Sequence, residues 1–491
     1  MKKVLFLAVL SLLLLLPATN VYGVNTRNYQ YHYDFWLLDI DSVPAFQLTR
    51  TLNESNSFAP IPVQGFDDVA VGGGRLFFAD AQGGRVNVLD ENYEWLTSIR
   101  LMRDAERNII ITEDGEQVLL EGPEGVFFHE GFNELYVADT PTNRLLVLDG
   151  DDYHLKRVIG RPDNMTGVTG FSPSKVVVDN AGRIYIIVQG GFEGIVELTP
   201  EGEFSRYFGV GRPVVNLVDF FWRMIATNEQ RAVMARTFAP SFNNVAIDPS
   251  GFVYATTYDS SSLFMVYRLN AKGENVLMEP ADIGGVVGDW FFEGGRFMPT
   301  SQFLAISVND YGVYAALDQA NNRVFVYNFE GELMSVINHP DGMAGGFRQP
   351  SGIAWHGDNL IVTDRGLRAA LVFELTEFGS YAFGAQRDYY NGNWESSARQ
   401  LERAIELNSN YNLAFAGIGR FYLMEEDYDQ AMYYLKLGQD RLYYSRAFNH
   451  WRNNWLQRNF WWIALLLVSG LAWIVYTEVR YHKRLKDEGG N

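Results

Sequence analysis

The sequence predicts a mainly β fold, a six-bladed β-propeller followed by a small α-helical domain and one transmembrane helix. Three observations support this fold class. A strand–turn–strand pattern occurs six times within residues 24–377, residues 378–450 change to a helical pattern, and residues 459–479 are apolar. Repeated units that cannot bury both faces of their own sheet do so when they are arranged radially.

Each repeated unit places two apolar runs around a polar turn, as in ELYVADTPTNRLLVLD at residues 134–149. A short apolar run precedes each unit, and most units are followed by one more strand-like run. Each unit therefore predicts a four-stranded antiparallel sheet. The six units are residues 75–90, 134–149, 183–198, 252–269, 312–328 and 359–375.

The sixth unit lacks an outer strand, because the sequence turns to a helical pattern directly after residue 375. Residues 45–53 alternate like a strand and have no other place in the repeats. We therefore expect this N-terminal strand to complete the sixth blade and to close the ring, which leaves no open sheet edge.

The polar turn at residues 139–144 groups an aspartate, an asparagine and an arginine, which is either a catalytic cluster or a structural turn. Equivalent residues recur in other units, and this favours the turn. The aspartate ends one strand, where its carboxylate can accept hydrogen bonds from the amides of the turn. An arginine five residues later opens the next strand and can pair with this aspartate across the turn. The aspartates are Asp80, Asp139, Asp318 and Asp364, and the arginines are Arg85, Arg144 and Arg323.

These units resemble the repeats of the NHL family. LYVADTPTNRLLVLD matches the family pattern closely, and FFADAQGGRVNVLD and YAALDQANNRVFVYN match it well. The resemblance covers about residues 46–375. It implies a β-propeller and says little about function, because NHL propellers include binding scaffolds and a few enzymes.

Two insertions interrupt the repeats. Residues 212–239 predict one or two helices, in which the adjacent Phe220, Phe221 and Trp222 cannot all point into one core. The segment is a helical cap on the propeller, a lid that faces a partner or ligand, or a patch that touches the membrane. These three aromatic residues are our partner-facing candidates, and the Gly-rich residues 281–297 are expected on the same face.

Residues 378–450 are self-similar at a spacing of 34 residues, in which Ser397 corresponds to Ala431 and Ala404 to Gly438. This period and the run LERAIELNSNY resemble tetratricopeptide repeats. Small residues at those places let two helices approach closely. The domain is either a spacer or a protein-docking groove beside the membrane, with tyrosines as contact anchors. The tyrosines are Tyr422, Tyr433, Tyr434, Tyr443 and Tyr444.

Both ends of the chain carry membrane-directed patterns. Residues 1–23 predict a cleaved signal peptide, with an uncleaved anchor as the alternative. Residues 459–479 are long enough to cross a bilayer and have aromatic residues at both ends. The basic tail at residues 480–491 predicts a cytoplasmic C-terminus and an extracytoplasmic N-terminal ectodomain in the cell membrane. This order of segments resembles a group of membrane-anchored extracytoplasmic proteins of Gram-positive bacteria, which is defined by architecture.

The composition excludes several function classes. The 491-residue chain has no cysteine, which removes disulfides, thiolate metal sites and cysteine nucleophiles. A net charge of −19 argues against binding nucleic acid through phosphate contacts. The sequence also lacks a Gly-x-Ser-x-Gly elbow, a His-Glu-x-x-His motif and a phosphate-binding glycine loop, so no catalytic residue is predicted from motifs.

The axial channel, where the inner strands begin, is the expected place for any chemistry of a propeller. Acids and amides there can bind Ca²⁺, which would resemble a lactonase of the gluconolactonase type. The motifs expected of that family are absent, and the alternative is that these residues satisfy backbone groups of strand starts and loops. The channel candidates are Asp68, Glu124, Lys175, Asn243, Asn244 and Gln302, beside Asp67, Ser174 and Ser351.

Two histidines, His129 and His356, fall at equivalent places in blades two and six, and His339 is the obvious third ligand. A zinc site needs more ligands that converge. Repeat symmetry explains the first two histidines, so the sequence predicts no metal site.

Two functions remain. The first is a non-enzymatic, membrane-tethered scaffold or sensor, whose propeller binds a protein or carbohydrate ligand and whose helical domain binds a membrane partner such as a transporter. The second is a calcium-dependent hydrolase of lactone-like substrates with its site in the axial channel. We favour the first function, because two interaction folds are joined to an anchor without a catalytic signature.

Overall fold

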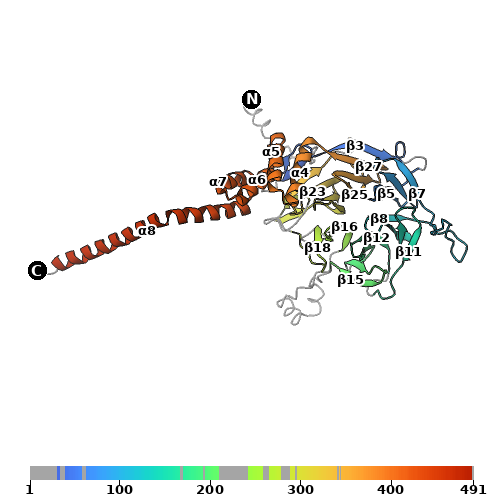
Figure 1. Ribbon diagram of the computed structural model, residues 1–491, viewed down its shortest axis with the longest axis horizontal. Coiled ribbons are helices and arrows are strands. Elements are labelled where there is room, and N and C mark those ends of the chain that lie inside the picture. The colour runs from blue at the N-terminus through green and yellow to red at the C-terminus, as the bar shows by residue number, and fades with distance from the viewer. Residues whose placement is uncertain are drawn as a thin grey trace, which may run out of the picture.

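The computed structural model describes residues 30–33, 39–57, 62–165, 170–191, 194–209, 241–257, 265–277, 288–293, 296–339, 342 and 344–488. The predicted signal peptide and the insertion that holds Phe220, Phe221 and Trp222 lie outside the described residues. Figure 1 shows a ring of small sheets on one side, a group of short helices at its edge, and the long helix α8 that projects away from both.

Six sheets form the ring, in agreement with the predicted fold class. The first three are β4 (Asp68–Gly72) to β7 (Trp95–Ile99), β8 (Pro123–His129) to β11 (Leu155–Ile159), and β12 (Pro173–Val178) to β15 (Phe204–Phe208). Their middle strands are β5 (Arg75–Asp80), β6 (Arg85–Asp90), β9 (Glu134–Asp139), β10 (Arg144–Asp149), β13 (Ile184–Val188) and β14 (Ile195–Leu198).

The other three sheets hold the remaining strands of the ring. Blade four has β16 (Phe242–Ile247), β17 (Val253–Thr257) and β18 (Val266–Leu269). Blade five has β21 (Phe303–Val308), β22 (Tyr314–Asp318), β23 (Arg323–Tyr327) and β24 (Leu333–Ile337). Blade six has β25 (Pro350–His356), β26 (Asn359–Asp364), β27 (Ala369–Leu375) and β3 (Phe46–Asn53).

Blade four departs from the four-stranded pattern that its sequence predicts. Among the described residues it has three strands, and the expected outer strand is reduced to one bridge between Leu269 and Asn275. Two further two-stranded pairs lie outside the blades: β1 (Tyr31–Tyr33) with β2 (Asp39–Asp41), and β19 (Trp290–Glu293) with β20 (Arg296–Pro299).

The N-terminal strand β3 closes the ring. It runs antiparallel to β27, with Asn53 opposite Ala369 and Phe46 opposite Leu375. Figure 1 shows the blue β3 beside the orange β27, so the two ends of the propeller share one sheet. This is the arrangement that the missing outer strand of the sixth unit required.

The hydrophobic core is divided among the spaces between neighbouring blades. Each of six clusters of buried side chains takes residues from two neighbouring blades. One of these clusters joins blade six to blade one. Between blades one and two, for example, Phe77 stacks on Phe128 with ring centroids 5.3 Å apart. Because both faces of each sheet are covered in this way, strands such as β9 and β13 are buried at every residue.

Four short helices follow the propeller: α4 (Glu377–Tyr390), α5 (Trp394–Leu407), α6 (Asn412–Met424) and α7 (Tyr428–Leu437). The first three share a core cluster with blades five and six, whereas α7 packs against α6 and α8. Thr376 begins the first helix by accepting a hydrogen bond from the amide of Gly379. A side chain at Gly438 would meet the backbone nitrogen of Ala416 at 2.4 Å, so this position needs a very small residue.

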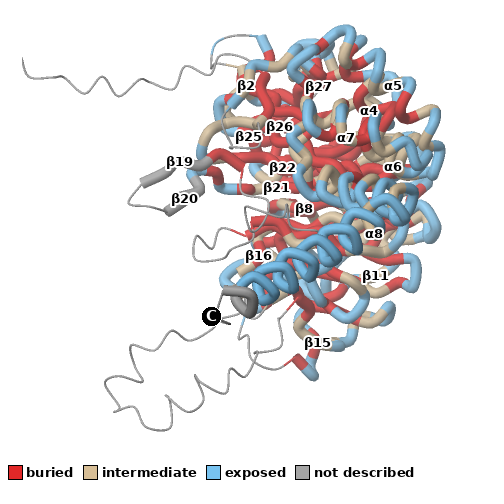
Figure 2. The backbone as a smooth tube through the Cα atoms, turned by 90° about the vertical axis from the view of Figure 1, so that its left-hand side faces the viewer, coloured by how far each residue is buried: buried red, intermediate tan, exposed pale blue. Residues whose placement is uncertain are grey.

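The last helix, α8, runs without a break from Arg441 to Glu488. Its 48 residues correspond to about 72 Å at 1.5 Å per residue, more than twice the thickness of a hydrocarbon core. Its most apolar window has a mean hydropathy of 1.8 and none of that window is buried, and most of α8 is pale blue in Figure 2. By length and composition, α8 is able to cross a membrane.

Candidate functional site

The axial channel is lined by the first strand of each of the six blades and encloses a cavity of about 190 Å³. Most of its lining residues are aliphatic, with Val69, Val126, Val176, Val245 and Ile353 among them, but the surface that faces the cavity is mainly polar. Of the predicted candidates, Asp68, Lys175 and Asn244 line this cavity. The channel is therefore a narrow space with few polar side chains but a largely polar surface.

Asp68 and Lys175 form an ion pair across the channel wall. Lys175 Nζ lies 2.9 Å from Asp68 Oδ2 and also donates to the backbone oxygen of Glu124 at 2.9 Å. The same Asp68 oxygen accepts from the amide of Val126 at 3.2 Å. These contacts join blades one, two and three, and they use the carboxylate that a channel-bound cation would require.

Glu124 and Asp67 lie outside the narrow channel, on a wider polar pocket of about 400 Å³. Glu124 accepts from Gln189 Nε2 at 2.6 Å, and burial raises the pKa of its carboxyl despite the opposing charge of Lys175. Asp67 Oδ1 lies 2.6 Å from Arg365 Nε. The pocket is lined by Gln64, Asp67, Gln82, Glu124, Gln349, Arg365 and Arg368.

The structure places the last two candidates away from this group. Asn243 bridges blades four and five, because its Nδ2 donates to Phe303 O at 2.7 Å and its Oδ1 accepts from Thr256 Oγ1 at 2.7 Å. The backbone amide of Gln302 donates to Asp318 Oδ1 at 2.8 Å, and its side chain is exposed. The structure thus brings together Asp68, Glu124 and Lys175 but not these two residues.

The three histidines have separate surroundings. His129 Nδ1 accepts from the amide of Phe132 at 3.1 Å, and His356 Nδ1 lies 3.0 Å from the hydroxyl of Tyr93. Burial lowers the pKa of His129, His339 and His356. Within the described ranges, the one group with metal-ligand spacing is Asp149, Asp152 and His154, which the sequence did not single out. His154 Nδ1 and Asp152 Oδ1 pair at 2.6 Å on an open surface, so this group is explained by that contact.

The repeated turns behave as structural elements in most blades. Asp139 is fully buried, accepts from the amide of Gly122 at 2.9 Å and pairs with Arg144 Nη2 at 2.9 Å. Asp80 pairs with Arg85 Nε at 3.1 Å in the same way. The turn interpretation of residues 139–144 agrees with these contacts.

Blade five shows that the expected arginine pairing is wrong there. Arg323 pairs with Asp289, which also accepts hydrogen bonds from the hydroxyls of Tyr31 and Tyr33. Asp318 is held instead by Ser301 Oγ at 2.6 Å and by other turn donors. The reason is that Asp289 and the β1 hairpin come from outside the repeat and offer Arg323 a buried partner.

A second ionic cluster joins the propeller to the helices. Arg420 on α6 donates to Glu330 Oε2 at 2.7 Å and to Glu332 Oε1 at 2.6 Å, both on the turn between β23 and β24. It also donates to Asp440 Oδ2 at 2.9 Å, directly before α8. Burial lowers the pKa of Arg420, but Glu332, Glu330 and Asp440 together hold that pKa above its usual value.

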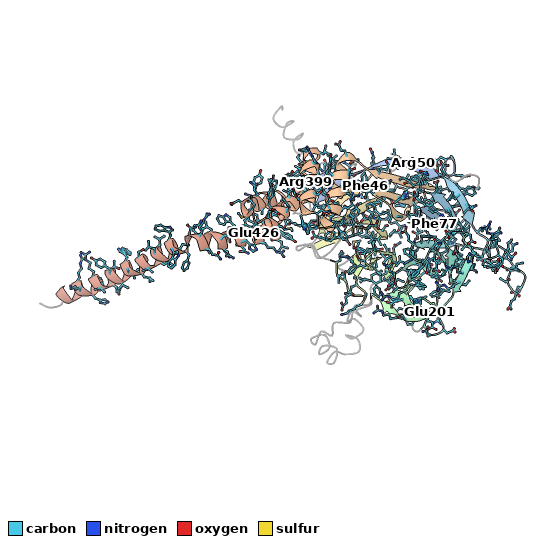
Figure 3. The ribbon with its side chains drawn as sticks, viewed as in Figure 1. Phe46, Arg50, Phe77, Glu201, Arg399 and Glu426 are labelled. Atoms are coloured by element: carbon cyan, nitrogen blue, oxygen red, sulfur yellow. The ribbon has the colours of Figure 1, made fainter. Side chains whose placement is uncertain are left out.

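Aromatic packing supports the same junction. Phe46 on β3 packs against Phe383 on α4 and Trp355 on β25, with ring centroids 5.1 and 6.2 Å apart. Figure 3 labels Phe46 close to the place where the helices meet the propeller. No local sequence pattern indicated the Arg420 cluster, because Arg420 lies 90 residues from Glu330.

No family model and no curated protein matches this chain. Among solved structures, virginiamycin B lyase from Staphylococcus aureus aligns with a TM-score of 0.41 and 12% identity, over 67% of this chain and 100% of that chain. Kuenenia stuttgartiensis hydrazine synthase gives 0.38 and 16%, over 68% and 82%. The WD40 β-propeller domain of Doa1 gives 0.39 and 10%, over 69% and 99%. At these values the likenesses do not bear on ligand or activity.

Proposed function

We propose that this chain is a membrane-anchored extracytoplasmic scaffold or sensor. Its propeller binds a protein or carbohydrate ligand, and its helical region binds a membrane partner such as a transporter. The observation that carries the proposal is the Arg420 cluster, which links blade five, α6 and the start of α8 through one guanidinium. A propeller held in this way keeps a fixed position relative to the membrane helix.

The hydrolase alternative finds less support in the geometry of the channel. A calcium ion at Asp68 would have to displace the ammonium group of Lys175, which lies 2.9 Å from the carboxylate. Calcium sites in proteins use six to eight oxygen ligands, whereas Asp68 is the one carboxylate among the described residues that line this cavity. The channel residues therefore do not fit a calcium centre, and we derive no reaction through one.

The orientation of α8 needs a direct test, because basic residues flank the apolar segment on both sides. Arg441, Arg446, Arg452 and Arg458 precede it, and Arg480, Lys483, Arg484 and Lys486 follow it. The proposed orientation relies on the predicted signal peptide as well as on the basic tail.

The chain has no cysteine, so single cysteines report its topology cleanly. In intact cells, a membrane-impermeant maleimide should label a Gln457→Cys variant and should label a His482→Cys variant only after permeabilisation. The opposite pattern would place the propeller in the cytoplasm and overturn the proposal.

A photo-crosslinking residue placed at Tyr433 tests the partner. Tyr433 is 60% exposed on α7. Irradiation of membranes should give a discrete crosslinked species from this position and none from the same residue placed at the exposed Glu201 in blade three. Only monomer from both positions would count against a partner on the helical region.

A further inference from the structure

The polar pocket at one face of the ring differs from the channel in the chemistry of its lining. All seven residues that line it are polar or charged, and its volume of about 400 Å³ falls in the range of small-molecule sites. Gln64 and Gln82 come from blade one, Glu124 from blade two, and Gln349 with Arg368 from blade six. Such a lining selects a polar ligand.

The repeated aspartates position the glutamines of this pocket. The backbone amide of Gln64 donates to Asp80 Oδ2 at 3.2 Å, and the amide of Gln349 donates to Asp364 at 3.1 Å. Their side-chain amides, and that of Gln82, make no hydrogen bond to the described residues. Each amide thus has a donor and an acceptor available for a ligand.

Arg368 is the residue that departs most from the repeat. The equivalent turn positions in blades one, two and five are Gly84, Asn143 and Asn322, and all four residues have a positive φ, which is 51° at Arg368. Glycine and asparagine adopt this left-handed conformation more readily than arginine does. The turn therefore carries a small conformational cost at Arg368 that folding does not require.

The arginine that opens the next strand in other blades is also missing here. Arg85 and Arg144 pair back on their aspartates, but blade six has Ala369 at that place. Instead, Arg365 and Arg368 line the pocket, and the Arg368 guanidinium forms no ion pair with the part of the chain that the structure describes. Because Arg365 already pairs with Asp67, Arg368 is the cation that blade six offers to a ligand in this pocket.

We infer that this pocket binds an acidic saccharide, with Arg368 on the carboxylate and the amides of Gln64, Gln82 and Gln349 on the hydroxyl groups. A guanidinium matches the two oxygens of a carboxylate, and primary amides both donate to and accept from hydroxyls. None of the seven lining residues is apolar, so the pocket is poorly suited to an apolar peptide side chain. This inference rests on the proposed function and names the class of its propeller ligand.

The test is titration calorimetry of the full chain in detergent with two probes. Glucuronosyl-glucose carries one carboxylate, and cellobiose is its neutral counterpart. The acidic disaccharide should bind roughly ten- to hundred-fold more tightly, as expected for one charge-assisted contact. Equal binding of the two disaccharides, or no binding of either, would overturn the inference. Competition by an acidic tetrapeptide at equal concentration would also overturn it, in favour of a peptide ligand.

Arg368→Asn is the informative variant, because asparagine accepts the left-handed conformation and the substitution removes the guanidinium. It should abolish the preference for the acidic probe while leaving the Tm unchanged or raised. Arg107→Asn is the matched control, since Arg107 is exposed, has a φ of 67° and lies outside the pocket. Retained preference in Arg368→Asn would exclude this arginine as the anion site.

The topology test of the proposed function is independent of this titration. A correctly oriented propeller that binds neither disaccharide would remove the saccharide inference alone. A cytoplasmic propeller would remove the proposed extracytoplasmic role whatever the titration shows.

Discussion

Asp440 and Arg420 connect the long helix α8 to the rest of the protein. One oxygen of Asp440, Oδ1, accepts from the amide of Tyr443 at 3.0 Å and so caps α8. The other, Oδ2, accepts from Arg420 Nη2 at 2.9 Å, and Arg420 in turn holds Glu330 and Glu332. The carboxylate that starts α8 is thus the same group that fixes it to blade five.

Replacing Arg420 should weaken this junction strongly. In Arg420→Met, three partly buried carboxylates lose their common cation, and we expect a loss of about 3–5 kcal/mol in the free energy of unfolding. Chemical denaturation of the full chain measures this loss. Arg399→Met is the control, because its pair with Glu395 is exposed and contributes at most about 1 kcal/mol. Equal losses in the two variants would contradict a special role for Arg420.

Protonation of Glu330 should make this junction more stable in mild acid. Burial raises the pKa of Glu330, Glu332 adds to the effect, and Arg420 opposes it. Because the folded pKa lies above the unfolded one, the contribution is fully present below the ordinary pKa of glutamate and is lost as pH rises through the folded value. Glu330→Gln removes this dependence.

At pH 7 the Tm of Glu330→Gln should therefore equal or exceed the Tm of the unmodified protein. This difference in Tm should become smaller as the pH falls towards 4.5, because Glu330 of the unmodified protein is then protonated. Glu395→Gln on the exposed face of α5 is the control for a general charge effect. A gap that widens on acidification would mean that Arg420 stabilises the Glu330 carboxylate more than burial destabilises it.

Asp139 should be needed for stability. Asp139→Ala leaves the amides of Glu121 and Gly122 and the side chain of Arg144 without their acceptor, at an expected cost of about 2–4 kcal/mol. Urea denaturation tests this value against Asp114→Ala in an exposed turn, which should change stability by less than about 0.5 kcal/mol. An unchanged midpoint together with lost ligand binding would restore the catalytic interpretation.

Phe46 should report on the closure of the ring. It is 1% exposed, so Phe46→Ala removes a ring that fills the space between β3, β25 and α4, at a cost of about 3–5 kcal/mol. Its neighbour Gln47 faces solvent on the same strand, and Gln47→Ala should be nearly neutral. Thermal unfolding that shows the same loss for both variants would mean that backbone pairing, and not this packing, closes the ring.

The sequence alone determined the repeated part of the protein. Period, turn residues and alternation predicted six blades, the outer strand at residues 45–53 and the aspartate turns, because these features depend on residues close together in the chain or on one repeated pattern. The apolar run inside α8 could also be recognised from the sequence, since its length and composition are enough to identify it. The outer strand of blade four was over-predicted, because a strand-like run there makes only one bridge.

Only the tertiary structure decided which polar side chains meet. Lys175 of blade three pairs with Asp68 of blade one, and Arg323 pairs with Asp289. Arg420 binds carboxylates from two turns that are far apart in the sequence. Each partner is tens to hundreds of residues away or lies outside the repeat, so no local pattern records the contact. The polar pocket arises in the same way, because closure of the ring brings the loops of blade six beside those of blades one and two.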